Sequence, residues 1–129
     1  IQGNANLLTL SGLQGVRSVR SIFIFANDAL ESLAGPKTCN IAAVSKLGLV
    51  GVTSVGKDND GRSIVISANG ALESLAGLAG VKGRLPGSLT IQGNANLSTL
   101  EGLRGVTSVD EDDEGRNVLI SANGKLNNL

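Results

Sequence analysis

The chain has 129 residues, 11 basic and 11 acidic side chains, one cysteine, two phenylalanines and no histidine, methionine, tryptophan or tyrosine. Without histidine and with one cysteine, it cannot form a histidine or cysteine zinc site, a Ser-His or Cys-His nucleophile pair, or an internal disulfide. Balanced charge and scarce aromatic side chains argue against a nucleic-acid partner, and no apolar run is long enough to span a membrane. We therefore expect no catalytic residues and no enzymatic activity.

The sequence repeats itself along almost its whole length. Residues 1–19 recur at 91–109, and residues 51–75 recur at 105–129. An isoleucine opens each copy, and the steps between successive openings are 23, 42, 25 and 29 residues: Ile1, Ile24, Ile66, Ile91 and Ile120. Removing a 13-residue insertion at 36–48 turns the long step into 29 (42 minus 13). We expect one domain over 1–129, a segment of a longer protein, with copies at about 1–20, 21–62, 63–87, 88–116 and 117–129.

The spacing of apolar side chains predicts the architecture. Within a copy they recur at every third position, as at Leu97, Leu100, Leu103 and Val106. An α-helix turns by about 100° per residue, so such a stripe would wind around the helix instead of lying on one face. A single strand is excluded because its side chains alternate with period two. Period two does occur locally, in chain order at 22–24, 64–66, 89–91 and 118–120. Together the two periods predict an all-β solenoid of four to five stacked coils, built from short strands and bends.

An asparagine follows each opening isoleucine by three residues. Because a buried side-chain amide is costly unless it is hydrogen-bonded, we expect these residues to form a structural ladder through the stack. Its members are Asn4, Asn27, Asn69, Asn94 and Asn123.

The combined pattern L-x-I-x-x-N-x-x-L-x-S/T-L-x-G-L-x-G-V-x-S-V resembles the leucine-rich repeats of the receptor L-domain type. The resemblance covers nearly the whole chain except residues 36–48. It implies a right-handed parallel β-helix with asparagine at the bend after the main strand, and an extracellular or cell-surface location. It implies no active site. The disulfide-bonded caps of receptor domains are missing here, so receptor-type ligand binding is not implied.

The insertion holds the only thiol, Cys39. A lone thiol can be buried and inert, or it can pair with another chain. No histidine or paired acid accompanies it in sequence, so we do not expect a catalytic cysteine. The segment 41–47 has a composition that allows one or two helical turns.

Two polar loops join copies, at 56–62 and 110–116. In the second, Asp110, Asp112 and Glu114 have the alternating spacing of oxygen ligands in a calcium loop, and a glycine follows them. The first loop has Gly56 in place of the leading acid, and neither loop offers a glutamate at the twelfth position. The favoured interpretation is therefore a solvated acidic turn relieved by salt and by Arg116, with calcium as the alternative and no other cofactor expected.

Alternation along the expected strands turns some apolar side chains away from the core. These side chains are those of Phe23, Phe25, Val65 and Leu119. We expect them to form an exposed apolar strip, of the kind that marks contact surfaces, unless the insertion or other sequence covers it. A second outward column consists of small polar residues: Thr9, Ser32, Ser74, Thr99 and Asn128. Such a column can match an ice or carbohydrate lattice, although Glu31 and Glu73 lie next to it and interrupt its regularity.

These features favour a structural or adhesive extracellular module. Its partners would be other protein chains of an assembly or further repeats of the same protein. The alternative is a solenoid that binds carbohydrate, ice or a peptide on its outer face.

Overall fold

The computed structural model of the chain describes residues 1–34 and 48–127. Cys39, the expected helical turns at 41–47 and Asn128 lie outside the described residues. Within them the regular structure consists of short parallel strands and single turns of 3-10 helix. The fold is therefore all-β with parallel sheets, as the two sequence periods predict at this level.

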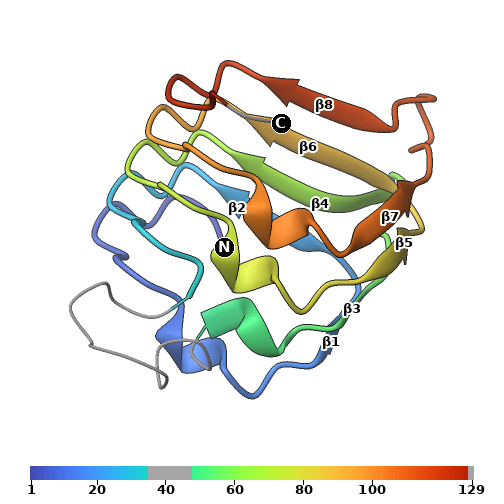
Figure 1. Cartoon of the computed structure of the whole chain (residues 1–129), viewed down its shortest axis with the longest axis horizontal. Helices are drawn as coiled ribbons and strands as arrows, with labels where there is room; N and C mark the ends of the chain where they lie inside the picture. Colours follow the sequence, from blue (N-terminus) through green and yellow to red (C-terminus); the bar gives the residue numbers. More distant parts are fainter. Residues whose placement is uncertain (35–47, 128–129) are drawn as a thin grey trace.

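The principal sheet has four parallel strands in the order β2 (Ile22–Phe25), β4 (Arg62–Ser67), β6 (Ser88–Gln92) and β8 (Val118–Ser121). Each strand comes from a different copy of the repeat. The opening isoleucines of these copies pair directly, Ile24 with Ile66, Ile66 with Ile91 and Ile91 with Ile120. Copies of unequal length thus enter the sheet in one register (Figure 1).

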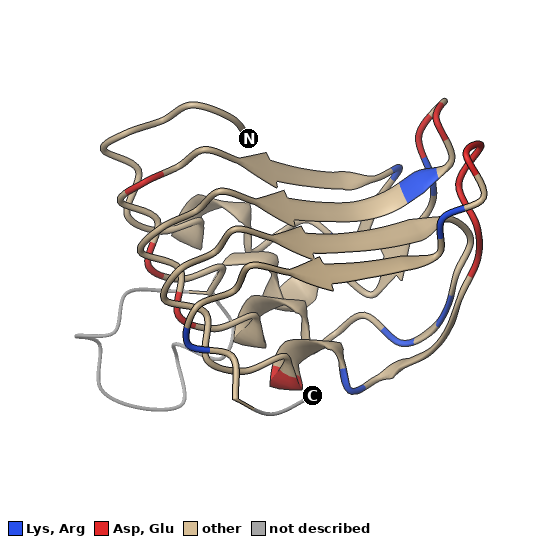
Figure 2. Ribbon diagram, turned by 90° about the horizontal axis from the view of Figure 1, so that it is seen from above, with Lys and Arg blue, Asp and Glu red and all other residues tan. Residues whose placement is uncertain are grey.

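The second half of each copy lies on the other side of the core. Strand β1 (Ser18–Val19) pairs with β3 (Ser54–Val55), and β5 (Gly83–Leu85) pairs with β7 (Val106–Val109). In the residues that the structure describes, one 3-10 helix precedes each of these strands, and the helices contact one another in sequence order: η1 (Ser11–Leu13), η3 (Gly48–Gly51), η4 (Ala76–Leu78) and η5 (Glu101–Leu103). Figure 1 shows the copies following one another in this order, and Figure 2 shows the helices beneath the principal sheet.

The core is made of columns of identical or similar side chains. Ile66, Leu72, Leu75 and Leu78 of the third copy are completely buried. Their counterparts in the first and last copies, such as Leu7, Leu13 and Ile120, are only partly buried. Burial therefore falls toward both ends of the chain, because each copy covers the apolar side chains of its neighbours.

In the second copy the repeat is interrupted after Leu33, and it is in register with the other copies again at Leu49. The Leu49 N–H donates to the Leu33 carbonyl at 3.0 Å, as Leu78 donates to Leu75 and Leu103 to Leu100, both at 2.8 Å. The structure places Gly48, which the sequence assigns to the insertion, in the first position of η3.

Every described bend before an asparagine uses a left-handed backbone conformation. In two copies the residue is glycine, Gly3 and Gly93, both at φ 67°. In the other three it is alanine, Ala26, Ala68 and Ala122, at φ between 51° and 55°. An alanine pays a steric penalty there that glycine does not, so packing of the neighbouring copies must hold these bends in place.

Candidate interaction surface

The outer face of the principal sheet carries two adjacent columns of side chains. Strand register places Phe23, Val65, Thr90 and Leu119 in the first column. It places Phe25, Ser67, Gln92 and Ser121 in the second. The four strands contain no acidic residue, and Arg62 at the start of β4 is their one charged residue (Figure 2).

The expected apolar strip is not continuous, which corrects the sequence interpretation. Phe23 and Leu119 are 38% and 41% exposed, whereas Phe25 and Val65 are half-buried. Thr90 separates Val65 from Leu119 within the first column, and Phe25 belongs to the second. The apolar surface therefore gathers around β2 and β4, with Leu119 apart from it at β8.

Phe23 is the centre of this aromatic patch, by which we mean Phe23, Phe25 and Val65. The rings of Phe23 and Phe25 are 6.1 Å apart between centroids and tilted by 40°. The Arg62 guanidinium carbon lies 6.0 Å from the centroid of the Phe23 ring, within reach of a cation–π interaction. Aromatic and arginine side chains are the types that most often dominate the binding energy of protein interfaces.

The five asparagines are brought together in one hydrogen-bonded column. Between neighbouring members of the column, the backbone N–H and the Nδ2 of one asparagine donate to the Oδ1 of the asparagine in the next copy. From Asn69 to Asn94 these bonds measure 3.1 and 3.2 Å. The same pair links Asn4 to Asn27 and Asn27 to Asn69, and Asn94 to Asn123. Asn27, Asn69 and Asn94 are completely buried, so the column satisfies polar groups inside the core.

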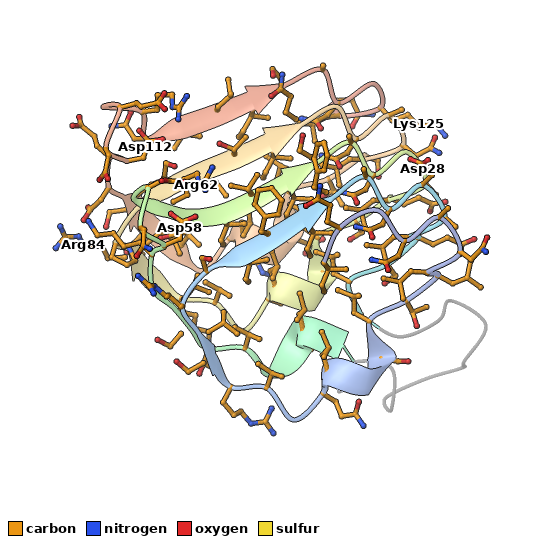
Figure 3. The ribbon with its side chains drawn as sticks, turned by 180° about the vertical axis from the view of Figure 1, so that it is seen from behind. Asp28, Asp58, Arg62, Arg84, Asp112 and Lys125 are labelled. Carbon is orange, nitrogen blue, oxygen red and sulfur yellow. The ribbon has the colours of Figure 1, made fainter. Side chains whose placement is uncertain are left out.

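Each polar loop is folded around one carboxylate and closed by one arginine. Asp112 Oδ1 accepts hydrogen bonds from the backbone N–H groups of Glu114 and Arg116, and Asp112 Oδ2 accepts one from Arg116 Nε at 3.0 Å. Asp58 makes the same three bonds with Asp60 and Arg62. Figure 3 shows Asp58, Arg62, Arg84 and Asp112 at one end of the molecule, opposite Asp28 and Lys125.

These bonds lower the pKa values of the loop carboxyls. The backbone N–H of Arg116 is the main cause that brings the pKa of Asp112 down from 3.8 to about 2. The side chain of Arg84, paired with Asp110 at 2.5 and 2.8 Å, lowers the pKa of that carboxyl. At Asp58, burial opposes ionisation, yet hydrogen bonds from Arg62 and Asp60 hold the pKa below its ordinary value.

The three acids proposed as calcium ligands do not converge on a common point. Asp110 pairs with Arg84 of the third copy, while Asp112 and Glu114 both pair with Arg116. Among the described residues, no group of three or more acidic, cysteine or histidine side chains is arranged to hold a metal ion. Arg116 does relieve part of the negative charge by pairing with Asp112 and Glu114, but Asp112 is only 7% exposed and so is not the solvated acid that the favoured sequence interpretation supposed.

Acid should therefore weaken the fold through Asp112. Because its folded-state pKa is below the ordinary 3.8, its contribution is complete above pH 4 and is lost as the pH falls toward about 2. We expect Asp112→Asn to flatten the decline of melting temperature between pH 4 and pH 2, and to lower the melting temperature at neutral pH. Asp113→Asn, at an exposed neighbour, is the matched control. An identical acid decline in the Asp112→Asn protein would contradict this role.

The two loops also contact each other across the third copy, whose own connection is short. The Asp113 N–H donates to the Asp60 carbonyl at 3.2 Å, and the Ser88 N–H donates to the Gly61 carbonyl at 3.0 Å. A Cβ on Gly61 would lie 2.8 Å from the Asp112 Cα and from the Asp113 nitrogen, so only glycine allows this approach.

The column of small polar residues forms, but its hydroxyls are used internally. Bridges link Thr9 to Ser32, Ser32 to Ser74, and Ser74 to Thr99. The hydroxyls of Ser32, Ser74 and Thr99 each accept the backbone N–H two residues ahead, at 3.1 Å. All four described members are half-buried, which corrects the expectation of an outward hydroxyl lattice.

In the part of the chain that the structure describes, no helix has the length and apolar character needed to cross a membrane. Comparison with models of protein families, with curated proteins and with solved structures finds no match for this chain.

Proposed function

We propose that this chain is a non-catalytic structural or adhesive module that makes protein contacts within a larger extracellular or cell-surface assembly. Its architecture is then a right-handed parallel β-helix similar to the leucine-rich repeats of the receptor L-domain type. Repeat sequences in one register, with asparagines and leucines in columns, support that architecture.

The observation that carries the proposed function is the aromatic patch beside Arg62. Phe23 is exposed on a sheet face whose strands contain no acidic residue, and the Arg62 guanidinium lies over its ring. Burial of these side chains against another protein removes apolar surface from water, while the Arg62 guanidinium stays paired with Asp58 and Asp60 of its own loop. The patch therefore suits a protein partner with an apolar surface.

The test replaces Phe23 and Phe25 together by serine. Both side chains lie on the outer face, so the melting temperature should change little, whereas assembly measured by sedimentation velocity should weaken at least about tenfold. Leu8→Ser is the control, because Leu8 is 57% exposed but lies outside the sheet. Assembly that is equally strong in the double variant and in the unchanged chain would contradict this contact surface.

The alternative is binding of a carbohydrate or peptide on the same face. Gln92 is exposed, and Ser67 and Ser121 are half-buried, in the column beside the aromatic patch. A glycan array distinguishes the two functions. A defined sugar retained by the unchanged chain and lost by the double serine variant would favour the ligand-binding module.

A further inference from the structure

One segment of the fourth copy has the sequence of an acceptor for an N-linked glycan. Within residues 1–129, Asn96 is the only asparagine that is followed two residues later by serine or threonine, in the segment Asn96-Leu97-Ser98. Asparagine in this pattern, with any residue except proline in the middle, accepts N-linked oligosaccharides in secreted proteins. The first copy has Asn6-Leu7-Leu8 at the same place, so the two copies differ by the hydroxyl of Ser98.

The structure places Asn96 on a turn at the surface. The Leu97 N–H closes this turn by donating to the Asn94 carbonyl at 3.0 Å. Ala95 and Asn96 are the two central residues of the turn, and the first is exposed while the second is half-buried. The Leu97 side chain is completely buried in the core. A surface turn of this kind can carry a bulky polar group without displacing core side chains.

The fold does not use the side-chain amide of Asn96. Among the described residues, this amide makes no hydrogen bond. Two residues earlier, by contrast, the Asn94 Nδ2 donates to the Ile66 carbonyl and to Asn123 Oδ1. Replacing one hydrogen of the Asn96 Nδ2 by a sugar therefore removes no described hydrogen bond from the folded chain.

The neighbouring copies leave room for a sugar at this turn. The residues two positions after the asparagines of the column are, in order of the copies, Asn6, Ala29, Ala71, Asn96 and Lys125. Beside Asn96, the third copy thus presents only the methyl group of Ala71, and the fifth presents Lys125, which is exposed. Both flanking turns belong to the chain itself, so these surroundings do not depend on any sequence before residue 1 or after residue 129.

The turn that holds Asn96 lies away from the polar loops. It packs against the turn of the fifth copy, because a Cβ on Gly124 would lie 3.0 Å from the Ala95 carbonyl oxygen. Lys125 of that turn lies at the end of the molecule opposite Arg62 (Figure 3). A glycan on Asn96 would therefore occupy the corner of the molecule that carries the asparagine column.

We propose that Asn96 is the attachment site of an N-linked oligosaccharide. The donor is an oligosaccharide joined to a membrane lipid through a pyrophosphate. The Asn96 Nδ2 bonds to the anomeric carbon of the first sugar and loses one proton. The bond from that carbon to the pyrophosphate oxygen breaks, and the lipid pyrophosphate leaves with the electron pair. The inference deepens the proposed function and rests on its extracellular or cell-surface location.

Ser98 supplies the hydroxyl that the acceptor pattern requires. In the folded chain its Oγ donates to the Glu73 carbonyl at 3.2 Å. Transfer therefore takes place before the fourth copy packs against the third, while this hydroxyl is still free. Once attached, a bulky hydrated glycan keeps other proteins away from this corner of the molecule. Contacts with partners are then confined to other surfaces, such as the outer sheet face and the polar loops.

The test directs the whole 129-residue chain into the secretory pathway of cultured animal cells with a cleavable leader peptide. The secreted protein should carry one glycan, which peptide N-glycosidase removes while leaving aspartate in place of Asn96. Mass spectrometry of the intact protein and of its peptides measures both effects. Ser98→Ala should abolish the glycan, and Ser98→Thr should retain it. The fold should survive Ser98→Ala, because this change removes one hydrogen bond at an exposed residue.

Two further variants serve as matched controls. Leu8→Ser completes the acceptor pattern at Asn6, which is exposed, and should add a second glycan there. Asn96→Gln removes the acceptor. Produced in the bacterial cytosol, where neither protein carries a glycan, this variant should melt at the temperature of the unchanged chain, since the Asn96 amide makes no described hydrogen bond.

The inference and the proposed contact surface fail separately. A secreted chain without a glycan at Asn96, or a glycan that persists in the Ser98→Ala protein, would overturn the attachment site. A glycosylated chain whose assembly tolerates serine at Phe23 and Phe25 would support the attachment site and contradict the aromatic patch as the contact. A chain that lacks the glycan, yet loses assembly in the double serine variant, would overturn the attachment site alone.

Discussion

Replacing Asn69 by alanine is expected to lower the free energy of unfolding by roughly 4 kcal/mol. Asn69 is completely buried, and its Oδ1 accepts two hydrogen bonds from Asn27. Its Nδ2 donates to two carbonyls, of Ile24 and Ser67, and to Asn94 Oδ1. The substitution leaves the donors of Asn27 and the Ile24 carbonyl without these partners inside the core, where water cannot replace them.

Urea denaturation measures this effect, and two variants serve as comparisons. Asn6→Ala removes an exposed amide and should change the free energy of unfolding by less than about 0.5 kcal/mol. Asn69→Asp keeps the acceptors but loses the Nδ2 donors, so it should also destabilise strongly. A loss at Asn69 no larger than that at Asn6 would show that the column contributes little to stability.

The second large effect is expected at Gly102, where alanine should cost roughly 3 kcal/mol of unfolding free energy. A Cβ at this position would lie 1.7 Å from the Leu75 carbonyl oxygen and 2.3 Å from its carbon. Both atoms belong to the main chain of the preceding copy, so relief requires the two copies to move apart. That movement would also weaken the contact between η4 and η5.

Gly12 provides a matched control, because it holds the same place in the first copy. Nothing lies within 4 Å of a Cβ built there, so Gly12→Ala should leave the free energy of unfolding unchanged or raise it slightly. Chemical denaturation of both variants measures the difference. Equal effects at the two glycines would mean that helix propensity, rather than the approach of neighbouring copies, governs these positions.

The parts of the structure that depend on repetition could be predicted from the sequence. Leu72, Leu75 and Leu78 occupy every third position and are fully buried. Each expected strand lies within an observed strand, with Ile66 and Ile91 paired as the repeat requires. Such positions are predictable because each copy places the same side chain in the same surroundings.

The polar loops were harder to predict because main-chain groups compete for their side chains. The spacing of Asp110, Asp112 and Glu114 suggested oxygen ligands, but backbone N–H groups and arginines take these carboxylates instead. The hydroxyls of Ser32 and Ser74 are likewise taken by N–H groups two residues ahead. A usable signal was present, since both loops share aspartate, then an acid, glycine and arginine at the same spacing.

Two other features depend on three-dimensional detail that one sequence does not contain. The left-handed bends at Ala26, Ala68 and Ala122 contradict the local preference of alanine and depend on packing of neighbouring copies. The half-burial of Phe25 and Val65 depends on how neighbouring side chains pack around them, although the place of Thr90 between Val65 and Leu119 already follows from the repeat.

The contact between the two polar loops affects the order in which the copies of the repeat unfold. In a repeat protein whose copies touch only their neighbours, each copy can open independently from an end. Here the bond from Asp113 to Asp60 ties the fourth copy to the second across the third. We expect hydrogen exchange to show early fraying of the first and fifth copies, while the second, third and fourth open together as one cooperative unit.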